Sequence, residues 1–352
     1  MGRAQLQRDV GKLQSLPYAL AKTSLSASWS VSSRSITEMA SRLGANRWRR
    51  TTVELVRSEK EGRPMTDQDA RPNAAAAGTF SLGGDLLVNR LGFGAMRLTG
   101  RGILGEPEDP DEARRVLRRA VELGVDLIDT ADSYGPEVSE RLIAEALRPY
   151  PDGLVVATKG GLTRPGGRWV PDGRPEHLRE ACEGSLRRLK VERIDLYQLH
   201  RPDPKIAFED SVWVLAQLRD EGKIRHVGLS NVGVRELEIA LDIVPVASVQ
   251  NRYNLSECSS EAVLRACERE GVGFMPWDPL ATGKLARPGG PLDEVAERHD
   301  VTPSQVALAW LLGHSPAMLP IPGTSSVAHL EENVAATTLE LTDEEMAMLE
   351  RS

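Results

Sequence analysis

The sequence predicts an α/β fold, a (β/α)8 TIM barrel that begins with an N-terminal β-hairpin and ends with a C-terminal helix. Two features of the chain lead to this prediction. Short apolar runs alternate with stretches in which apolar residues recur at helical spacing, and every helical stretch follows a strand-like run. There are eight such pairs, the number that closes a parallel sheet into a barrel.

The hairpin comes first, with strands at 79–82 and 85–89 on either side of the turn glycines Gly83 and Gly84. The eight strand-like runs are 91–95, 125–131, 154–159, 194–200, 225–230, 246–250, 272–276 and 318–322. The helical stretches are 111–123, 139–148, 175–189, 208–221, 234–244, 259–270, 303–312 and 327–336, and a terminal helix is expected at 342–349. Pro149 ends the second of them, because proline cannot continue a helix.

A doubly wound parallel sheet is the alternative fold, and its dinucleotide-binding members carry a Gly-x-Gly-x-x-Gly turn after the first strand. The chain offers Gly92 and Gly94 but has Arg97 where the third glycine belongs. The close approach of helix and strand that this glycine allows is therefore not provided. We exclude a Rossmann phosphate loop here and expect the chemistry at the carboxyl ends of the barrel strands.

The composition is that of an ordinary soluble domain, with 352 residues, 40% of them hydrophobic and 27% charged. No apolar run is long enough for a transmembrane helix, so a membrane role is not expected. Cys182, Cys258 and Cys267 form neither a Cys-x-x-Cys pair nor an even disulfide set. They indicate a reducing compartment, so we expect a cytoplasmic protein with no cysteine-bound metal.

Charge is distributed unevenly along the chain. Residues 1–64 hold 12 Lys and Arg against 5 Asp and Glu, and the whole chain has a net charge of −7, which leaves −14 on the rest. An acidic body argues against nucleic acid as a partner. Residues 1–78 show no periodicity and are expected to be disordered, either as upstream sequence from a wrong start codon or as a transit peptide. Residues 79–352 form the barrel.

Three consecutive strands end in polar residues that can carry chemistry: Asp129 and Tyr134, then Lys159, then His200. A lysine between the carboxylate and the phenol would favour phenolate, lower the pKa of Tyr134 and make it a general acid. A neutral His200 could hold a substrate carbonyl beside it. The alternative for Asp129 and Lys159 is a structural ion pair at the barrel rim.

The later strands end in groups that suit a nicotinamide dinucleotide. Ser230, Asn231 and Gln250 can bind a carboxamide, and the indole of Trp277 can stack on a flat ring. The segment Gly323, Thr324 and Ser325 precedes a helix whose N-terminus can hold phosphate. Individually, these residues are typical of a helix cap or of core packing, and together they describe a cofactor across the barrel mouth.

From residue 79 onward the chain resembles the aldo-keto reductase superfamily. The resemblance is carried by LGFGAMRL (91–98), DTADSYG (129–135), ATKGG (157–161), IDLYQLHRPDP (194–204), GLSN (228–231), VQNRYN (249–254), PWDPL (276–280) and IPGTSSVAHLEEN (321–333). It implies that Tyr134 donates a proton, that Asp129 and Lys159 tune it, and that His200 orients the carbonyl. The residues that it implies for NADP(H) are Gly94, Met96, Ser230, Asn231, Gln250, Trp277, Pro279, Leu280, Gly323, Thr324, Ser325, His329, Glu332 and Asn333.

The chain departs from the family pattern at two places. Gly323 and His329 stand where many members carry cations that bind the 2′-phosphate of NADP(H). NADP(H) is still expected over NAD(H), because the N-terminus of the following helix can hold phosphate, but this support is weaker than a cation would give. Asp278 introduces a negative charge near the pyrophosphate path, and the sequence offers no explanation for it.

The function that the resemblance implies is NADPH-dependent reduction of an aldehyde or ketone, a small-molecule substrate that could be pyridoxal. Two loops are expected to shape the substrate pocket, residues 164–174, which contain Trp169, and residues 203–206. The alternative for Trp169 is a residue of a surface hairpin. The alternative function is an NADP(H)-binding sensor or regulatory subunit with little turnover. A metal-dependent hydrolase is disfavoured because the strand ends lack a histidine and carboxylate ligand set. No interface is evident, so a monomer is the default.

Overall fold

The computed structural model describes residues 72–281 and 290–351. Most of the extension expected at 1–78 therefore lies outside the described residues. Its last residues are described and include the 3₁₀ helix η2 (Ala74–Ala77), which is capped by the Asn73 side chain. The amide of Ala74 donates to the Leu123 carbonyl at 2.8 Å, and Ala74 is buried. The packed unit thus begins a few residues before the boundary expected at Thr79.

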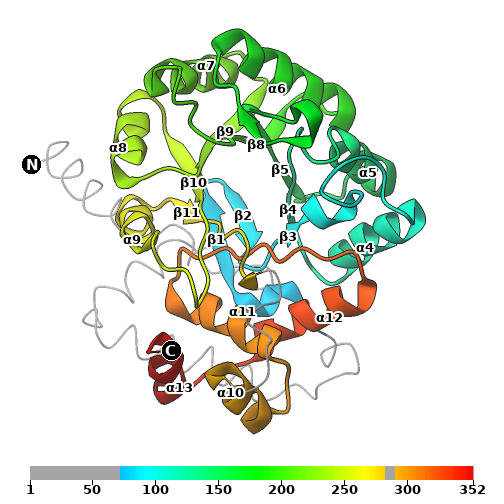
Figure 1. The fold of residues 1–352 in the computed structure, drawn as a ribbon, viewed down its shortest axis with the longest axis vertical. Coiled ribbons are helices and arrows are strands. Elements are labelled where there is room, and N and C mark those ends of the chain that lie inside the picture. The colour runs from blue at the N-terminus through cyan, green and yellow to red at the C-terminus, as the bar shows by residue number, and fades with distance from the viewer. Residues whose placement is uncertain (1–71, 282–289, 352) are drawn as a thin grey trace, which may run out of the picture. The chain divides into compact units, whose positions relative to one another are not determined.

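Seven parallel strands form one sheet in the order β11-β10-β9-β8-β5-β4-β3, with helices around the outside (Figure 1). Their register places Asp129 opposite Ala157 and Lys159 opposite Gln198. The candidate catalytic side chains of neighbouring strands therefore lie at similar levels along the strand direction, near the carboxyl ends. The strands are β3 (Phe93–Gly94), β4 (Leu127–Asp129), β5 (Val155–Gly160), β8 (Ile194–Leu199), β9 (Ile224–Ser230), β10 (Val246–Gln250) and β11 (Gly273–Phe274).

The two edges of this sheet are joined by the segment 317–322, which completes the barrel. Phe274 donates to the Ala317 carbonyl at 2.8 Å, and Leu319 donates back to Phe274 at 2.8 Å. On the other side, Gly92 and Gly94 of the β3 segment donate to the carbonyls of two prolines in 317–322, at 3.0 and 3.3 Å. The predicted eighth strand at 318–322 is not a regular strand, because Pro320 and Pro322 lack the amide hydrogens that a ladder requires.

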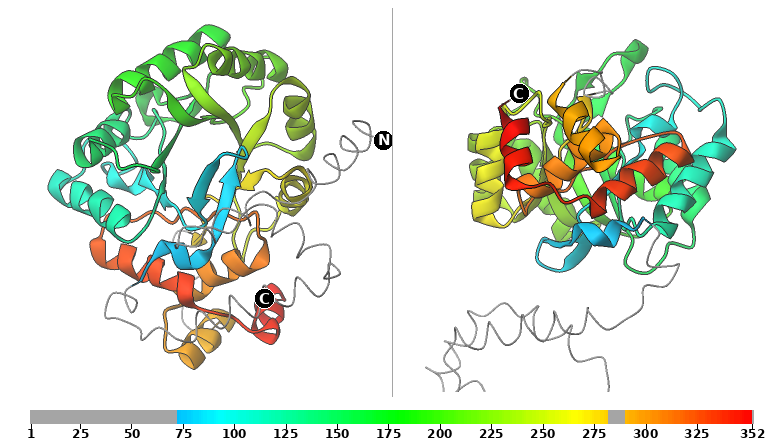
Figure 2. Two further views of the ribbon diagram at one scale, coloured as in Figure 1. Left: turned by 180° about the vertical axis from the view of Figure 1, so that it is seen from behind. Right: turned by 90° about the horizontal axis from the view of Figure 1, so that it is seen from below.

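An antiparallel pair, β1 (Thr79–Leu82) and β2 (Leu86–Asn89), lies across one end of the barrel (Figure 2). Its turn glycines, Gly83 and Gly84, both have positive φ. Leu82 and Val88 are fully buried against the barrel interior. The hairpin therefore closes the amino-terminal end of the strands, and the open end is the carboxyl-terminal one.

The helices begin and end where the sequence provides caps. Asp109 and Pro110 start the first helix, with the Asp109 carboxylate accepting from the Glu112 amide at 2.8 Å. Thr302 and Pro303 start another in the same way. The helices are α4 (Pro110–Glu122), α5 (Val138–Leu147), α6 (Pro175–Leu189), α7 (Phe208–Asp220), α8 (Val234–Ile243), α9 (Glu261–Glu270), α10 (Pro291–His299), α11 (Pro303–His314), α12 (Val327–Ala335) and α13 (Asp343–Glu350).

The helix α10 was not predicted. A small hairpin of β6 (Leu162–Thr163) and β7 (Val170–Pro171) follows β5, where a surface hairpin carrying Trp169 was one of the two alternatives. The turn of this hairpin contains the 3₁₀ helix η4 (Pro165–Gly167). Other short 3₁₀ helices are η3 (Ala95–Leu98) and η6 (Ala336–Thr338).

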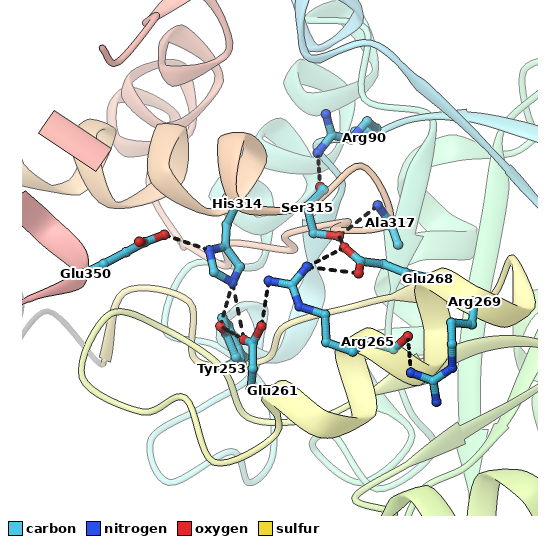
Figure 3. Close-up of polar contacts among 10 residues, drawn as sticks. All are labelled: Arg90, Tyr253, Glu261, Arg265, Glu268, Arg269, His314, Ser315, Ala317 and Glu350. Carbon is cyan, nitrogen blue, oxygen red and sulfur yellow. Dashed lines mark hydrogen bonds and ion pairs between the residues drawn. The ribbon is translucent and has the colours of Figure 1, made fainter. Parts of the chain in front are cut away.

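The C-terminal helix α13 is held to the barrel by polar contacts (Figure 3). His314, at the end of α11, contacts Glu350 of α13 at 3.3 Å and Glu261 of α9 at 3.2 Å. The hydroxyl of Tyr253 donates to the same Glu261 carboxylate. Among the described helices, none has the length and apolar content needed to cross a membrane.

Candidate active site

Asp129 and Tyr134 meet Lys159 at the carboxyl ends of β4 and β5. Lys159 Nζ donates to Asp129 Oδ2 at 2.6 Å and to the Tyr134 hydroxyl at 3.4 Å. A third bond, to the Thr130 carbonyl at 2.9 Å, completes its donors. The Lys159 and Asp129 side chains are 0% and 3% exposed, so each charge needs the other to offset its lost hydration. Lys159 thus lies between the carboxylate and the hydroxyl, as the sequence predicted.

The second carboxylate oxygen of Asp129 is fixed by two amides. Gln198 Nε2 donates to Asp129 Oδ1 at 3.0 Å, and Gln250 Nε2 donates to it at 2.8 Å. Gln198 was not among the predicted site residues, although it faces Lys159 across the β5–β8 ladder. The amide nitrogen of Gln250, expected to bind a carboxamide, is therefore occupied by Asp129, which leaves its carbonyl oxygen for a ligand.

His200 follows β8 and is held on one side by Ser133. Its Nδ1 lies 3.3 Å from Ser133 Oγ, and its ring meets that of Tyr134 edge to face at 5.8 Å. Burial lowers the pKa of His200 well below 6.5, and the charges of Lys159 and Arg201 lower it further. The imidazole is therefore neutral at physiological pH, as the sequence analysis expected.

The expected fall in the Tyr134 pKa does not occur. Burial raises the pKa of Tyr134 above its usual 10, and the lowering effect of Lys159 is opposed by the Asp129 carboxylate. The prediction rested on the lysine alone, whereas the loss of water around the buried phenol has the larger effect on its pKa. Tyr134 is therefore a neutral phenol at physiological pH.

A cavity of about 480 Å³ opens at this end of the barrel, a size suited to a small-molecule ligand. Lys159 lies beneath its wall, and the phosphate-binding candidates Thr324, Ser325, His329, Glu332 and Asn333 are not among the lining residues. The predicted residues that line it are Gly94, Met96, Asp129, Tyr134, His200, Ser230, Asn231, Gln250, Trp277, Pro279, Leu280 and Gly323.

Ser230 ends β9 at the cavity wall, and Asn231 begins the strained turn that follows. Asn231 has φ of 59°, and its amide nitrogen donates to the His200 carbonyl at 3.1 Å and to Ser230 Oγ at 2.9 Å. Trp277 lies further round the wall, and its buried indole Nε1 has no hydrogen-bond partner among the described residues. Such an unpaired buried donor is uncommon in a protein and suits a polar ligand.

The structure explains Asp278. Its carboxylate contacts Arg252 Nη2 at 3.0 Å, and the Arg252 guanidinium lies 5.7 Å from the centre of the Trp277 ring. The negative charge beside the cavity is therefore paired, and the cation that pairs it also covers Trp277.

The structure also accounts for Gly323. A Cβ built there would lie 2.5 Å from the Gly94 carbonyl oxygen, so the barrel closure at this point leaves no room for a side chain. The nearest side chain is that of Arg97, which lines the cavity and was not among the predicted site residues. Thr324 accepts from the Ser326 amide at 3.1 Å, and Glu332 accepts from Thr302 at 2.6 Å, so both take part in local helix contacts.

The loop 164–174 reaches the cavity, whereas 203–206 does not. Trp169 lines it and lies 6.4 Å from the Tyr134 ring and 6.3 Å from the His200 ring. Asp203 instead accepts from the Gly173 amide at 3.1 Å and so supports the end of the other loop. The cavity is also lined by Ile103 and Leu162, which lie in no quoted motif, and by Arg201, Ile321 and Pro322, which lie in quoted motifs but were not predicted as site residues.

Comparison with known proteins gives a consistent result. A model of the aldo/keto reductase family matches residues 90–352. An uncharacterized oxidoreductase of Schizosaccharomyces pombe is 53% identical over 279 residues, which are 79% of this chain and 90% of the relative. Pyridoxine 4-dehydrogenase of Escherichia coli is 42% identical over 283 residues, which are 78% of this chain and 98% of the relative. The structure of an aldo/keto reductase of Klebsiella pneumoniae, crystallised with NADP and acetate, matches this one with a TM-score of 0.66 and 29% sequence identity. The match covers 78% of this chain and 94% of the Klebsiella chain.

Proposed function

Because the chain belongs to the aldo/keto reductase family, we propose that it reduces an aldehyde or ketone to an alcohol with NADPH, and that Tyr134 donates the proton. Family membership confirms the predicted enzyme class, an oxidoreductase. The observation that carries the proposal is Lys159 bonded to both Asp129 and Tyr134, beside a neutral His200, at the end of a ligand-sized cavity. Pyridoxal is the substrate that we propose first, because of the likeness to pyridoxine 4-dehydrogenase.

The residues around the cavity fit NADP(H). Ser230, Asn231 and the free oxygen of Gln250 can bind the carboxamide, and Trp277 can lie against the nicotinamide ring. Arg97 offers a cation beside Gly323, where the family's usual lysine is excluded. When bound, NADPH supplies the hydride that reduces the carbonyl carbon.

Tyr134 is suited to donate a proton to the carbonyl oxygen. The alkoxide that develops there is a stronger base than phenolate, so a phenol whose pKa is raised still transfers its proton favourably. The buried ammonium of Lys159 then stabilises the phenolate left behind, and Asp129 keeps that ammonium in place.

His200 positions the carbonyl. Ser133 holds its Nδ1 edge, and the ring lines the cavity beside Tyr134. A neutral imidazole can donate one hydrogen bond to the substrate oxygen without competing for the Tyr134 proton. We also propose a cytoplasmic location, since Cys182, Cys258 and Cys267 are all free thiols.

The test measures the loss of NADPH absorbance when the full chain is mixed with NADPH and pyridoxal. The wild type is compared with Tyr134→Phe. We expect the variant to lose at least about a hundredfold in kcat, as is typical of removing a general acid, and to bind NADPH unchanged. NADH in place of NADPH tests the cofactor.

Tyr150→Phe is the matched control, because the Tyr150 hydroxyl donates to the Leu189 carbonyl and lies away from the cavity. It should keep wild-type turnover. Full activity of Tyr134→Phe would refute the proton-donor role. Tight NADPH binding by the wild type with no turnover of any carbonyl would favour a sensor instead.

A further inference from the structure

Arg164, in the turn of the β6–β7 hairpin, uses its guanidinium entirely on backbone carbonyls. Nε and Nη2 donate to the Gly167 carbonyl at 3.2 and 3.0 Å. Nη1 donates to Ile103 at 2.9 Å, and Nη2 also donates to Gly102 at 3.0 Å. One side chain thus ties the hairpin to the loop that follows β3, which is 61 residues away in the sequence.

The same guanidinium covers one face of Trp169, with its carbon 3.6 Å from the centre of the ring. This is a close cation–π stack, which the planar arginine makes better than lysine does. Trp169 approaches both Tyr134 and His200 with its ring at a steep angle to theirs. Three aromatic rings therefore surround the point where the carbonyl would react.

The second loop held by Arg164 also forms part of the cavity. Ile103 lines it and has φ of 61°, a left-handed conformation that is a marked outlier for a β-branched residue. Its carbonyl accepts from Arg164 and also from the amide of Gly135, the residue after Tyr134, at 3.3 Å. The strained turn is thus fixed to the hairpin and to the segment that carries Tyr134.

We infer that Arg164 is a positioning residue that holds Trp169 across the cavity as a flat wall, and that this wall selects carbonyls attached to an aromatic ring. The inference rests on the proposed carbonyl reduction. Because the guanidinium covers one indole face, the remaining face and edge are what a substrate meets. A planar ring can stack there while its carbonyl reaches Tyr134 and His200. A small aliphatic aldehyde gains little from such a wall.

The test compares 4-nitrobenzaldehyde with methylglyoxal in the wild type, Arg164→Ala, Arg164→Lys and Trp169→Ala. We expect kcat/KM for 4-nitrobenzaldehyde to fall about tenfold in both Arg164 variants and about thirtyfold in Trp169→Ala, mainly through KM. The value for methylglyoxal should change less than about twofold. Combining Arg164→Ala with Trp169→Ala should add little beyond the tryptophan variant, since arginine acts largely through it.

Arg168→Ala is the matched control, because Arg168 lies in the same hairpin with an exposed side chain. It should behave as the wild type. Hydrogen exchange of residues 100–105 and 162–171 gives a readout that does not depend on turnover. We expect faster exchange in Arg164→Ala and no change in Arg168→Ala.

Several results would overturn the inference. An equal loss on both aldehydes would show that the Trp169 wall does not select aromatic carbonyls. Wild-type kinetics in Arg164→Lys would show that Arg164 contributes charge rather than position. Unchanged hydrogen exchange in Arg164→Ala would show that it does not hold the two loops. If the wild type reduced neither aldehyde, the proposed function itself would fail and the selectivity with it.

Discussion

Replacing Lys159 by methionine should destabilise the barrel, and a second change, Asp129→Asn, should recover much of the loss. In the wild type both side chains are almost fully buried and 2.6 Å apart. Without the ammonium, Asp129 keeps its bonds from Gln198 and Gln250 but loses its counter-charge. Leaving one partner of a buried pair uncompensated costs about 3–5 kcal/mol, whereas removing both charges costs much less.

The size of the folded unit converts this cost into a melting temperature. For a domain of more than 200 residues, 1 kcal/mol corresponds to about 2 °C, so Lys159→Met should melt about 6–10 °C lower. The double variant should recover about half of that. The assay is thermal unfolding followed by circular dichroism at pH 7, with all variants scanned at one rate because melting of large proteins is often irreversible.

The pH dependence provides an internal control. Burial by itself would lower the pKa of Lys159, but Asp129 and Tyr134 raise it overall above 10.5. Its contribution to stability is therefore complete below about pH 10.5 and is lost only as the pH rises through the folded-state pKa. The difference between Lys159→Met and wild type should be the same at pH 7 and pH 9. Losses from the two single variants that simply add in the double variant would refute the coupling.

Three other predictions test separate features. The pKa of His200 lies well below 6.5 in the folded state, so at low pH the unfolded chain binds a proton that the folded chain does not, and stability falls as the pH drops below about 6.5. In His200→Gln, the melting temperature should therefore fall less between pH 7 and pH 5 than it does in the wild type. Gly323→Ala should lose about 1–3 kcal/mol in urea unfolding, because its Cβ meets the Gly94 carbonyl, and a wild-type midpoint would contradict this. Tyr253→Phe should melt about 2 °C lower with unchanged turnover, because its hydroxyl contacts with Glu261 and His314 are lost (Figure 3), and a fall in kcat would contradict this.

The strand ends could be predicted because parallel strands bring their carboxyl ends together whatever the loops do. Asp129, Lys159 and His200 each follow a largely apolar run. In the structure Asp129 and His200 line the cavity, and Lys159 contacts the lining residues Asp129 and Tyr134. Hydropathy placed the last strand correctly but not its regularity. Residues 318–322 complete the barrel, yet Pro320 and Pro322 have no amide hydrogen to donate, so the segment is not a regular strand.

Side-chain electrostatics were harder to predict than position. The sign of the Tyr134 shift depends on burial, which the sequence does not state, and burial outweighs the lysine. Gln198 carries no signal as a lone glutamine in an apolar strand, yet it fixes the Asp129 carboxylate. The departures from the family pattern at Gly323 and Asp278 can be explained only from the structure. The Gly94 carbonyl leaves no room for a side chain at Gly323, and Asp278 is paired with Arg252.

Backbone strain at the site is concentrated in the loops around the cavity and not in the strands that carry Asp129 and Lys159. Among the described non-glycine residues with positive φ, three end or begin helices: Glu137, Lys190 and Asp300. The others line the cavity or adjoin it, and they are Ile103, Asn231, Asp278 and Ala281.

None of these four cavity residues lies inside a strand, whereas Asp129 and Lys159 belong to β4 and β5. Strain of this kind persists only where surrounding contacts enforce it. At Ile103 that contact is Arg164, and at Asn231 it is the His200 carbonyl. Substitution of Arg164 should therefore change which carbonyl is accepted before it changes the proton transfer, because Asp129 and Lys159 are held by the strands and bonded to each other.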